Sequence, residues 1–329
     1  MHLKICVIGC CGHVGMVLEG IAASGGQQVV CAYSGTKEDN VDALRDMITN
    51  EGIQAKCYAD YREMLDQEQP DICVVDNVFY RHGEATAYAL SKGISTFCEK
   101  PLALNLPELE KVREAAKGTG ALLWAMQTMR YDPLFYTARH LVKQGAIGEV
   151  LMLNAQKSYR LGSRPDFYRK RETFGGTIPW VAIHPIDSIL SLVENKVETV
   201  YATHSAKGNQ GHEELEASGQ ILLRLSGGIH TGINFDYLRP ASAPTHGDDR
   251  IRIAGTEGVL EIRAGKIDLI DKNGASSPEI MTSPSVWEAF IDAHNGHPGL
   301  ITTENSIEST RIALLAREAA DKDEVIIAR

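Results

Sequence analysis

The N-terminal third of the chain alternates short apolar segments with amphipathic ones, and this alternation constrains the fold more than any other feature. Strands that alternate with helices predict a parallel, doubly wound sheet with helices on both faces, a Rossmann-type α/β domain. The predicted strands are Leu3–Ile8, Gln28–Tyr33, Ala55–Tyr58, Ile72–Asp76, Ser95–Cys98 and Ala121–Ala125. The predicted helices are Val14–Ser24, Asn40–Asn50, Tyr61–Leu65, Glu84–Lys92 and Leu106–Lys117.

The pattern changes after about residue 125, where strand-like segments follow one another with short turns between them. A chain of 329 residues is long enough for two hydrophobic cores. We therefore expect a dinucleotide-binding domain over residues 1–124 and an α+β domain over residues 125–329 with a predominantly antiparallel open sheet. Gly227-Gly228 and Ala264-Gly265 are expected hairpin turns.

Composition limits the partners of the chain. The formal net charge of −10 argues against nucleic acid or an anionic membrane, because clustered Lys and Arg drive binding to phosphates. No segment approaches the roughly 20 apolar residues that a membrane span requires. The N-terminus runs directly into a strand pattern, so we expect no signal peptide and a cytoplasmic location.

The cysteines do not indicate a disulfide framework or a metal site. All seven precede residue 99, they form no C-x-x-C pair, and most lie in apolar segments. We interpret them as small buried side chains in a reducing compartment. His246-Gly247-Asp248-Asp249-Arg250 contains metal-ligand residue types, but its spacing matches no structural zinc pattern. No metal is expected.

A glycine-rich turn follows the first predicted strand and opens the first predicted helix. Residues 8–15 read I-G-C-C-G-H-V-G, with the spacing G-x-x-G-x-x-G in place of G-x-G-x-x-G. Glycines in this context allow a pyrophosphate to approach the free N–H groups of the helix. The turn could be purely structural, but the surrounding strands and helices favour nucleotide binding. The candidate cofactor-binding residues of the turn are Gly9, Cys11, Gly12, His13 and Val14.

The segment after the second predicted strand bears on the choice of cofactor. An NAD site usually places an acidic residue there on the ribose, but the segment Ser34-Gly35-Thr36-Lys37 has no acid before Glu38. Ser34 and Thr36 could bond a 2′-phosphate and Lys37 could neutralise it. We expect NADP to be preferred, with NAD also possible, although Lys37 could equally be a solvated loop residue.

Cys98-Glu99-Lys100-Pro101 closes the predicted parallel array at the end of a strand. Ligands of such sheets bind at the carboxyl ends of the strands, where Gly9 and Lys100 are both predicted to lie. A lysine held there could direct its ammonium toward a substrate hydroxyl and a nicotinamide ring.

With these motifs in order, the chain resembles the glucose–fructose oxidoreductase/inositol dehydrogenase (Gfo/Idh/MocA) family essentially end to end. The matching segments are the glycine turn, 71–75, His82, 98–103, 130–133, 145–150, Gly175-Gly176 and 184–187. The resemblance implies a Rossmann domain, an α/β domain whose open sheet often forms an oligomer interface, and hydride transfer between a nicotinamide and a sugar or polyol. It also implies that Lys100 is a catalytic residue and that Glu99 supports it and the cofactor. His82 would lie near the nicotinamide, and His184 would be the acid/base group.

The chain departs from the family pattern at two places. Many relatives carry Asp four residues before the histidine, where this chain has Trp180. That tryptophan could stack on a sugar ring or fill the core. Asn77-Val78 stands where the family often has Thr-Pro, and Asn77 could still bond the ribose or the nicotinamide amide.

A polyol needs several hydrogen-bonding partners, so further polar residues should face the substrate. The candidate substrate-binding residues are Tyr159, Arg160, Trp180, His184, Asp187 and Tyr237. A homodimer or homotetramer through the C-terminal sheet is the expected assembly.

Three functions remain open. The leading one is an NAD(P)-dependent dehydrogenase or ketoreductase of a carbohydrate alcohol. The second is a redox-neutral lyase, epimerase or glycoside-cleaving enzyme that recycles a tightly bound cofactor, which the missing Asp at position 180 favours. The third is a non-catalytic regulator that responds to the dinucleotide.

Overall fold

The chain forms two compact units in the computed structural model, which describes residues 3–25 and 28–328. One unit extends to Gln127 and also contains Ser285–Thr310. The other comprises Thr128–Pro284 and the chain from Arg311 onward. The sequence analysis assigned residues 1–124 to one domain and all of residues 125–329 to the other. It did not anticipate that Ser285–Thr310 belongs to the first unit.

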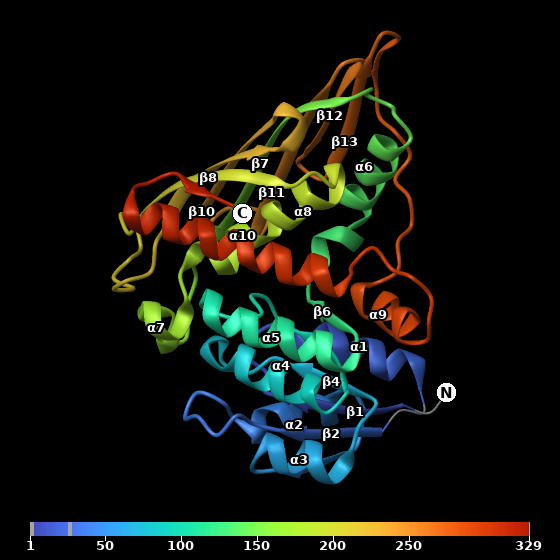
Figure 1. Ribbon diagram of the computed structural model, residues 1–329, viewed down its shortest axis with the longest axis vertical. Helices are drawn as coiled ribbons and strands as arrows, with labels where there is room; N and C mark the ends of the chain where they lie inside the picture. Colours follow the sequence, from blue (N-terminus) through green and yellow to red (C-terminus); the bar gives the residue numbers. More distant parts are fainter. Residues whose placement is uncertain (1–2, 26–27, 329) are drawn as a thin grey trace. The chain divides into compact units, whose positions relative to one another are not determined.

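The first unit is built on a six-stranded parallel sheet with the strand order β3-β2-β1-β4-β5-β6 (Figure 1). The order reverses between β1 and β4, which makes the carboxyl ends of these two strands the switch point where ligands of such sheets bind. The Rossmann-type fold expected from the sequence is therefore confirmed. The strands are β1 (Lys4–Ile8), β2 (Gln28–Ala32), β3 (Ala55–Tyr58), β4 (Ile72–Val75), β5 (Ser95–Cys98) and β6 (Leu123–Ala125). The helices of this unit are α1 (Val14–Ser24), α2 (Val41–Asn50), α3 (Tyr61–Glu68), α4 (His82–Ser91), α5 (Leu106–Thr119) and α9 (Val286–His294).

Side-chain caps determine where several of these helices begin. The Asn40 side chain accepts from the N–H groups of Asp42 and Ala43, and Asp60 caps α3 in the same way. Asn105 caps α5. Such caps satisfy N–H groups that have no partner within the helix, and each contributes about 1 kcal/mol.

The second unit contains a nine-stranded sheet with the order β14-β13-β12-β11-β7-β10-β9-β8-β15. Only the pairing of β7 with β10 is parallel among its described strands. This agrees with the predominantly antiparallel sheet expected from the sequence. The strands are β7 (Val150–Arg160), β8 (Val197–Ser205), β9 (Ser218–Leu225), β10 (Ile229–Arg239), β11 (Gly247–Gly255), β12 (Gly258–Arg263), β13 (Lys266–Asp271), β14 (Gly274–Ser276) and β15 (Ile326–Ile327).

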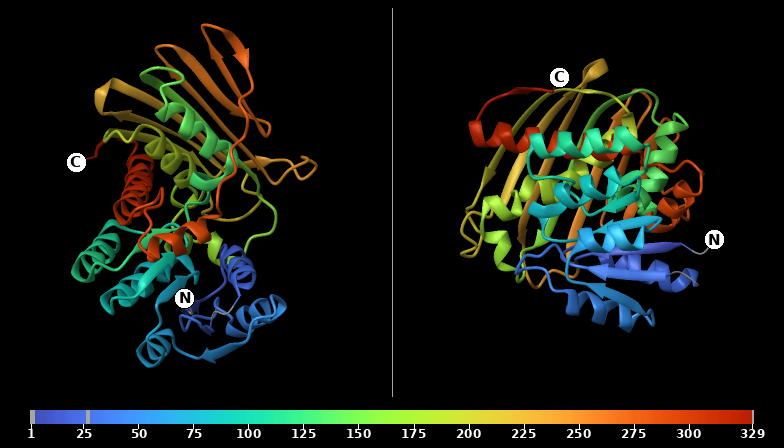
Figure 2. Two further views of the ribbon diagram at one scale, coloured as in Figure 1. Left: turned by 90° about the vertical axis from the view of Figure 1, so that its right-hand side faces the viewer. Right: turned by 60° about the horizontal axis from the view of Figure 1, so that its bottom comes forward.

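Helices cover one face of this sheet. Figure 2 shows α6 (Pro133–Lys143) and α8 (Ile183–Val193) on that face, and both contact its strands. A short helix α7 (Arg171–Phe174) and a π-helical segment, Ile178–Ala182, precede α8, and α10 (Thr303–Lys322) lies near the C-terminus. The helical stretch Arg171–Val193 is long and apolar enough to cross a membrane, which differs from the sequence analysis. Of its most apolar 18-residue window, 89% is buried within the protein, as expected of a core helix.

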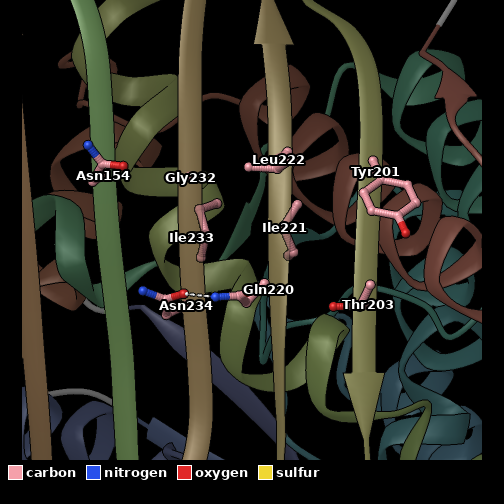
Figure 3. Close-up of a pocket in the computed structure, with 9 residues that line it drawn as sticks. All are labelled: Asn154, Tyr201, Thr203, Gln220, Ile221, Leu222, Gly232, Ile233 and Asn234. Atoms are coloured by element: carbon pink, nitrogen blue, oxygen red, sulfur yellow. Dashed lines mark hydrogen bonds between the residues drawn. The ribbon is translucent and has the colours of Figure 1, made fainter.

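The opposite face of the nine-stranded sheet carries exposed apolar side chains, namely Met152, Leu222, Leu238 and Ile270, which alternate with buried or half-buried residues along their strands. Figure 3 shows a shallow hollow on these strands, lined by neutral residues that include Asn154, Tyr201 and Gln220. Gln220 donates to Asn234 across two adjacent strands at 2.9 Å. The hollow contains no charged group, so we do not assign catalysis to it.

Candidate functional site

The glycine turn between β1 and α1 is shaped by close contacts that exclude a side chain. A Cβ atom at Gly9, where φ is +75°, would lie 2.4 Å from the Cα atom of Asn77. At Gly12 it would lie 2.5 Å from Oδ1 of Asp76 and 2.7 Å from Oε2 of Glu99. Glycine is therefore required at both positions, and the turn brings the carboxyl ends of β1, β4 and β5 together.

Two buried carboxylates lie beneath this turn. The Val14 N–H donates to Asp76 Oδ2 at 2.9 Å, and the His13 N–H donates to Glu99 Oε2 at 3.0 Å. Burial, together with repulsion from Glu99, raises the pKa of Asp76 well above its usual range. Burial also acts to raise the pKa of Glu99, but attraction from His13 and Lys100 outweighs it and lowers that pKa. Glu99 is therefore the charged member of the pair, and Asp76 retains its proton more readily.

Glu99 contacts the side chains of both His13 and Lys100. Its Oε2 lies 2.7 Å from Nδ1 of His13, and its Oε1 lies 3.4 Å from Nζ of Lys100. Lys100 is only 1% exposed, whereas nearly half of the His13 side chain is exposed. A buried ammonium held by a buried carboxylate has a fixed position, which is what a positioned catalytic cation needs.

His82 braces the ends of β4 and β5. Its Nδ1 lies 2.8 Å from the carbonyl oxygen of Pro101, and its Nε2 lies 2.9 Å from that of Asn77. Burial lowers the pKa of the imidazole, although both carbonyl oxygens favour the protonated ring. Because the main chain meets both ring nitrogens, the structure gives His82 a bracing contact in addition to the expected place near the nicotinamide.

Two buried amides at this end of the sheet have no hydrogen-bond partner in the part of the chain that the structure describes. They are Asn77, which follows β4, and Gln127, which follows β6. A buried amide without a partner costs free energy, so such groups indicate a missing ligand. Donors and acceptors at the carboxyl ends of these strands fit the ribose and carboxamide of a nicotinamide cofactor. Asn77 and Gln127 therefore fit a nicotinamide cofactor at this end of the sheet.

The loop after β2 contains a carboxylate, Asp39, beside the hydroxyl groups that were expected to bind a 2′-phosphate. Asp39, which the sequence analysis did not consider, lies over the glycine turn and is largely buried. Its carboxylate accepts from the hydroxyl groups of Ser34 and Thr36 and from the Val78 N–H at 3.2 Å. The Cys11 thiol also donates to it at 3.4 Å. The two hydroxyls assigned to a 2′-phosphate are thus engaged with a carboxylate.

Lys37, the third residue of that assignment, has a side chain that is 90% exposed and lies 3.9 Å from Glu38. It is solvated, which corresponds to the alternative left open in the sequence analysis.

In the second unit, Trp180 and His184 lie on consecutive helical segments. Trp180 belongs to the π-helical segment Ile178–Ala182, and His184 lies in the first turn of α8. Both side chains are largely buried. Isolated π-helical turns are rare and are often found at functional sites.

Asp187 forms a buried ion pair three residues beyond His184. Oδ2 and Oδ1 of Asp187 accept from Nε and Nη2 of Arg130 at 2.8 and 2.6 Å. This bidentate geometry is the strong form of an arginine–carboxylate contact. The structure therefore places Asp187 in a pair with Arg130, which the sequence analysis did not identify.

Tyr159 and Tyr237 lie together on the helix-covered face of the sheet, with ring centroids 6.3 Å apart. Trp180 packs edge-on against Tyr168 at 6.1 Å. Burial raises the pKa of both Tyr159 and Tyr237. Arg160 donates to the Ala243 carbonyl oxygen at the end of β7. The structure thus brings the expected aromatic residues to the carboxyl ends of β7 and β10.

Three residues of these sites were missed by sequence reasoning, namely Asp39, Asp76 and Gln127. Asp76 could have been found, since it is the last residue of a predicted strand at the switch point. Asp39 lies only three and five residues from Thr36 and Ser34, so it could also have been considered, whereas the pairing of Arg130 with Asp187 joins segments 57 residues apart.

A glycine turn at the switch point of a parallel sheet, beside buried unpartnered amides, defines a dinucleotide-binding protein. Residues 3–127 match the oxidoreductase family with an NAD-binding Rossmann fold, and residues 135–261 match the GFO/IDH/MocA C-terminal domain. The chain belongs to the Gfo/Idh/MocA oxidoreductase family, as the sequence motifs predicted.

Known proteins agree with this assignment. A myo-inositol 2-dehydrogenase of Thermotoga maritima is 26% identical over 83% of this chain and 79% of its own. An uncharacterized oxidoreductase of Streptococcus pneumoniae is 25% identical over 68% of this chain, and the match spans 59% of that relative. A solved structure from Thermotoga maritima, classed as an oxidoreductase, is 41% identical with a TM-score of 0.94, covering 99% of this chain and 100% of that one. A levoglucosan dehydrogenase in complex with NADH and levoglucosan shares the fold, with a TM-score of 0.82 at 16% identity over the whole of both chains.

Proposed function

We propose that the protein transfers a hydride between a nicotinamide cofactor and an alcohol or ketone carbon of a sugar or polyol. The observation that carries this proposal is the buried Lys100–Glu99 pair at the carboxyl end of β5, beside the unpartnered amide of Asn77. The names of relatives, myo-inositol 2-dehydrogenase among them, support the substrate class.

The cofactor would be held by the glycine turn and the residues around it. Gly9, Cys11, Gly12, His13 and Val14 would lie along the phosphates. The N–H groups of His13 and Val14 already donate to Glu99 and Asp76 in this structure, so the other groups of the turn would make the contacts. Asn77, Val78, His82, Glu99 and Lys100 would lie toward the nicotinamide. When bound, the nicotinamide supplies the hydride acceptor or donor.

The protein supplies the remaining chemistry. Oxidation of an alcohol requires a group that takes the hydroxyl proton, and an imidazole titrates in the useful range. We assign this role to His184, as the family resemblance implies. The ammonium of Lys100 would stabilise the negative charge that develops on the substrate oxygen.

We further propose that NAD is preferred over NADP, in place of the preference expected from the sequence. The carboxylate of Asp39 engages Ser34 and Thr36. A carboxylate at that position accepts hydrogen bonds from a ribose diol and repels a 2′-phosphate. Ser34 and Thr36 then orient Asp39, and Lys37 remains in solvent.

Three further proposals concern the setting of the enzyme. The substrate is a small molecule, with no nucleic-acid or membrane partner, and the location is the cytoplasm. The exposed apolar face of the nine-stranded sheet forms the interface of a homodimer or homotetramer.

The activity is tested by nicotinamide absorbance with NAD or NADP and a panel of inositols, hexoses, uronates and anhydro-sugars. We expect reduction with one substrate class, and a kcat that falls about 10²–10⁴-fold in Lys100→Met. Lys117→Met, which changes an exposed lysine of α5, is the control and should leave kcat unchanged. Circular dichroism of each variant separates lost chemistry from lost folding. Turnover without net reduction would instead support the redox-neutral route, and cofactor binding without any turnover would support the regulator.

A further inference from the structure

Three cationic side chains gather around the aromatic residues at the carboxyl end of β7. They are Lys157 and Arg160 of that strand and Arg164 of the following loop. Lys157 is only 5% exposed, and its ammonium lies 4.9 Å from the centre of the Tyr159 ring. The Tyr159 ring stacks on His246 with centroids 5.0 Å apart. We call Lys157, Arg160 and Arg164 the cationic cluster.

Arg164 is held in place without a carboxylate. Its guanidinium lies 5.0 Å from the ring centre of Tyr237 and 5.6 Å from that of Tyr168. It donates to the backbone carbonyl of Arg160 at 3.3 Å, and its Nε is buried with no hydrogen-bond partner. No ion pair joins Arg164 to an acid among the described residues. Two aromatic rings thus orient a planar donor group whose charge is paired with no carboxylate in the described part of the chain.

The charge balance of the cluster is positive. Lys157 pairs with Asp249 at 2.6 Å, and this is the one carboxylate that we find paired with the cluster in residues 3–25 and 28–328. Arg160 donates to the backbone of Ala243 and, like Arg164, pairs with no described acid. Burial, and then Arg164, Arg160 and Lys157, lower the pKa of His246, so all three cations act on the same place. This concentration of positive charge stands out in a chain whose net charge is −10.

Aromatic rings and an open space lie next to the cluster. A hollow of about 610 Å³ includes Gly247 and Asp249, the partner of Lys157. The three cations are not among its lining residues, and its charged lining is mixed, with two arginines and three carboxylates. Aromatic rings pack against the apolar faces of sugars, while the guanidinium fork matches the two oxygens of a carboxylate or phosphate. A neutral polyol would leave the charge of Arg164 unpaired.

We infer that the substrate is an anionic sugar, a sugar acid or a sugar phosphate, whose negative group pairs with Arg164 while Lys157 lies at the base of the site. This inference rests on the proposed function, since it names the substrate class of the same enzyme. Arg164 is the residue that distinguishes anionic from neutral sugars.

The test compares matched ligands on the holoenzyme: glucose, glucuronate and glucose 6-phosphate, and then galactose and galacturonate. Calorimetry gives the affinities and nicotinamide absorbance gives KM and kcat. We expect an anionic member to bind about 10–150-fold more tightly than its neutral counterpart, which is the range of a charged hydrogen bond. The affinities for the uronates and for glucose 6-phosphate show whether the site binds a carboxylate or a phosphate.

Arg164→Gln should remove this preference by raising the KM for the anionic sugar about 10–150-fold with little change in kcat. Arg164→Lys keeps the charge but loses the fork, and should recover only part of the affinity. Arg169→Gln is the matched control, because Arg169 lies in the same segment and pairs with the exposed Asp166. It should leave KM unchanged.

The inference is overturned if neutral sugars are oxidised with equal or lower KM and Arg164→Gln behaves like Arg169→Gln, a result that leaves the proposed function standing. It is also overturned if no anionic sugar binds. Binding of an anionic sugar that depends on Arg164, without nicotinamide reduction, would support the anion site and contradict the dehydrogenase.

Discussion

At the scale of single residues, Asp39 controls the choice of cofactor in our proposal. Asp39→Asn removes a negative charge but keeps an oxygen that can accept from Ser34 and Thr36. We expect the ratio of kcat/KM for NADP to that for NAD to rise about tenfold or more, since repulsion of the 2′-phosphate is lost.

The control is Asp42→Asn, which removes a charge from the exposed start of α2 and should leave the ratio unchanged. The assignment of Asp39 to the ribose fails if both variants give the wild-type ratio. Melting temperatures measured in parallel show whether the loop after β2 is still folded.

The raised pKa of Asp76 predicts that this residue affects the stability of the protein. Its pKa is raised in the folded protein by burial and by Glu99. A carboxyl group whose pKa is higher in the folded than in the unfolded protein lowers the free energy of unfolding once the pH rises above the unfolded-state pKa. This cost disappears at lower pH, where the group is protonated in both states. Asp76→Asn removes the charge and keeps an oxygen for the Val14 N–H. We expect the variant to melt higher than the wild type at pH 8, by roughly 2–4 °C per kcal/mol gained, with the difference vanishing near pH 4. A difference that grows as pH falls would contradict the raised pKa.

At the scale of elements, local patterns in the sequence predict most strands. The predicted strands Ala55–Tyr58 and Ser95–Cys98 agree with β3 and β5 at both ends. The turn Ala264-Gly265 is confirmed, because both residues have positive φ and join β12 to β13 as a two-residue hairpin.

Elements without a local pattern were missed. The strands β14 and β15 are three and two residues long, so alternation cannot identify them. The π-helical segment Ile178–Ala182 carries Pro179 and lies within a buried apolar stretch that indicates a helix but not its type. The glycine turn was predictable from spacing, and Arg160 was among the expected substrate-binding residues. The contacts of Asp39 with Cys11 and Val78 depend on the fold, since they join segments 28 and 39 residues apart.

The ion pair of Arg130 and Asp187 joins two elements, the 3₁₀ segment Thr128–Tyr131 and α8. Asp187→Asn leaves a buried guanidinium without its charge partner, which costs about 3–5 kcal/mol of unfolding free energy. Urea titration measures the loss, and the double variant Arg130→Met/Asp187→Leu should recover most of it because the pair is replaced by apolar volume.

Glu194→Gln provides the comparison for this pair. Glu194 also joins α6 to the end of α8, through Arg139 at 3.3 Å, but its side chain is exposed. An exposed pair contributes at most about 1 kcal/mol, so this change should have a small effect. Equal losses for Asp187→Asn and Glu194→Gln would show that the buried pair has no special importance for α8.

At the scale of the whole molecule, we expect an assembly through the open sheet. Met152, Leu222 and Leu238 are exposed and alternate along their strands with buried residues, so they face away from the core of the second unit. Contiguous apolar patches on a protein surface usually mark an interface. A second copy of the chain is the partner that the family resemblance implies, because open sheets of this family often form oligomers.

Leu222 lies on β9, between β10 and β8 in the sheet, and is 58% exposed. Leu222→Arg places a charge in the proposed interface, where a second copy would bury it without a partner. We expect light scattering to show a multiple of 36.0 kDa for the wild type and a mass close to 36.0 kDa for the variant. Ile280→Arg changes a comparably exposed apolar residue outside the strands of the sheet and should leave the mass of the wild type. An oligomer that survives Leu222→Arg would mean that copies of the chain meet through another surface, and the apolar face of the sheet would then need a different partner.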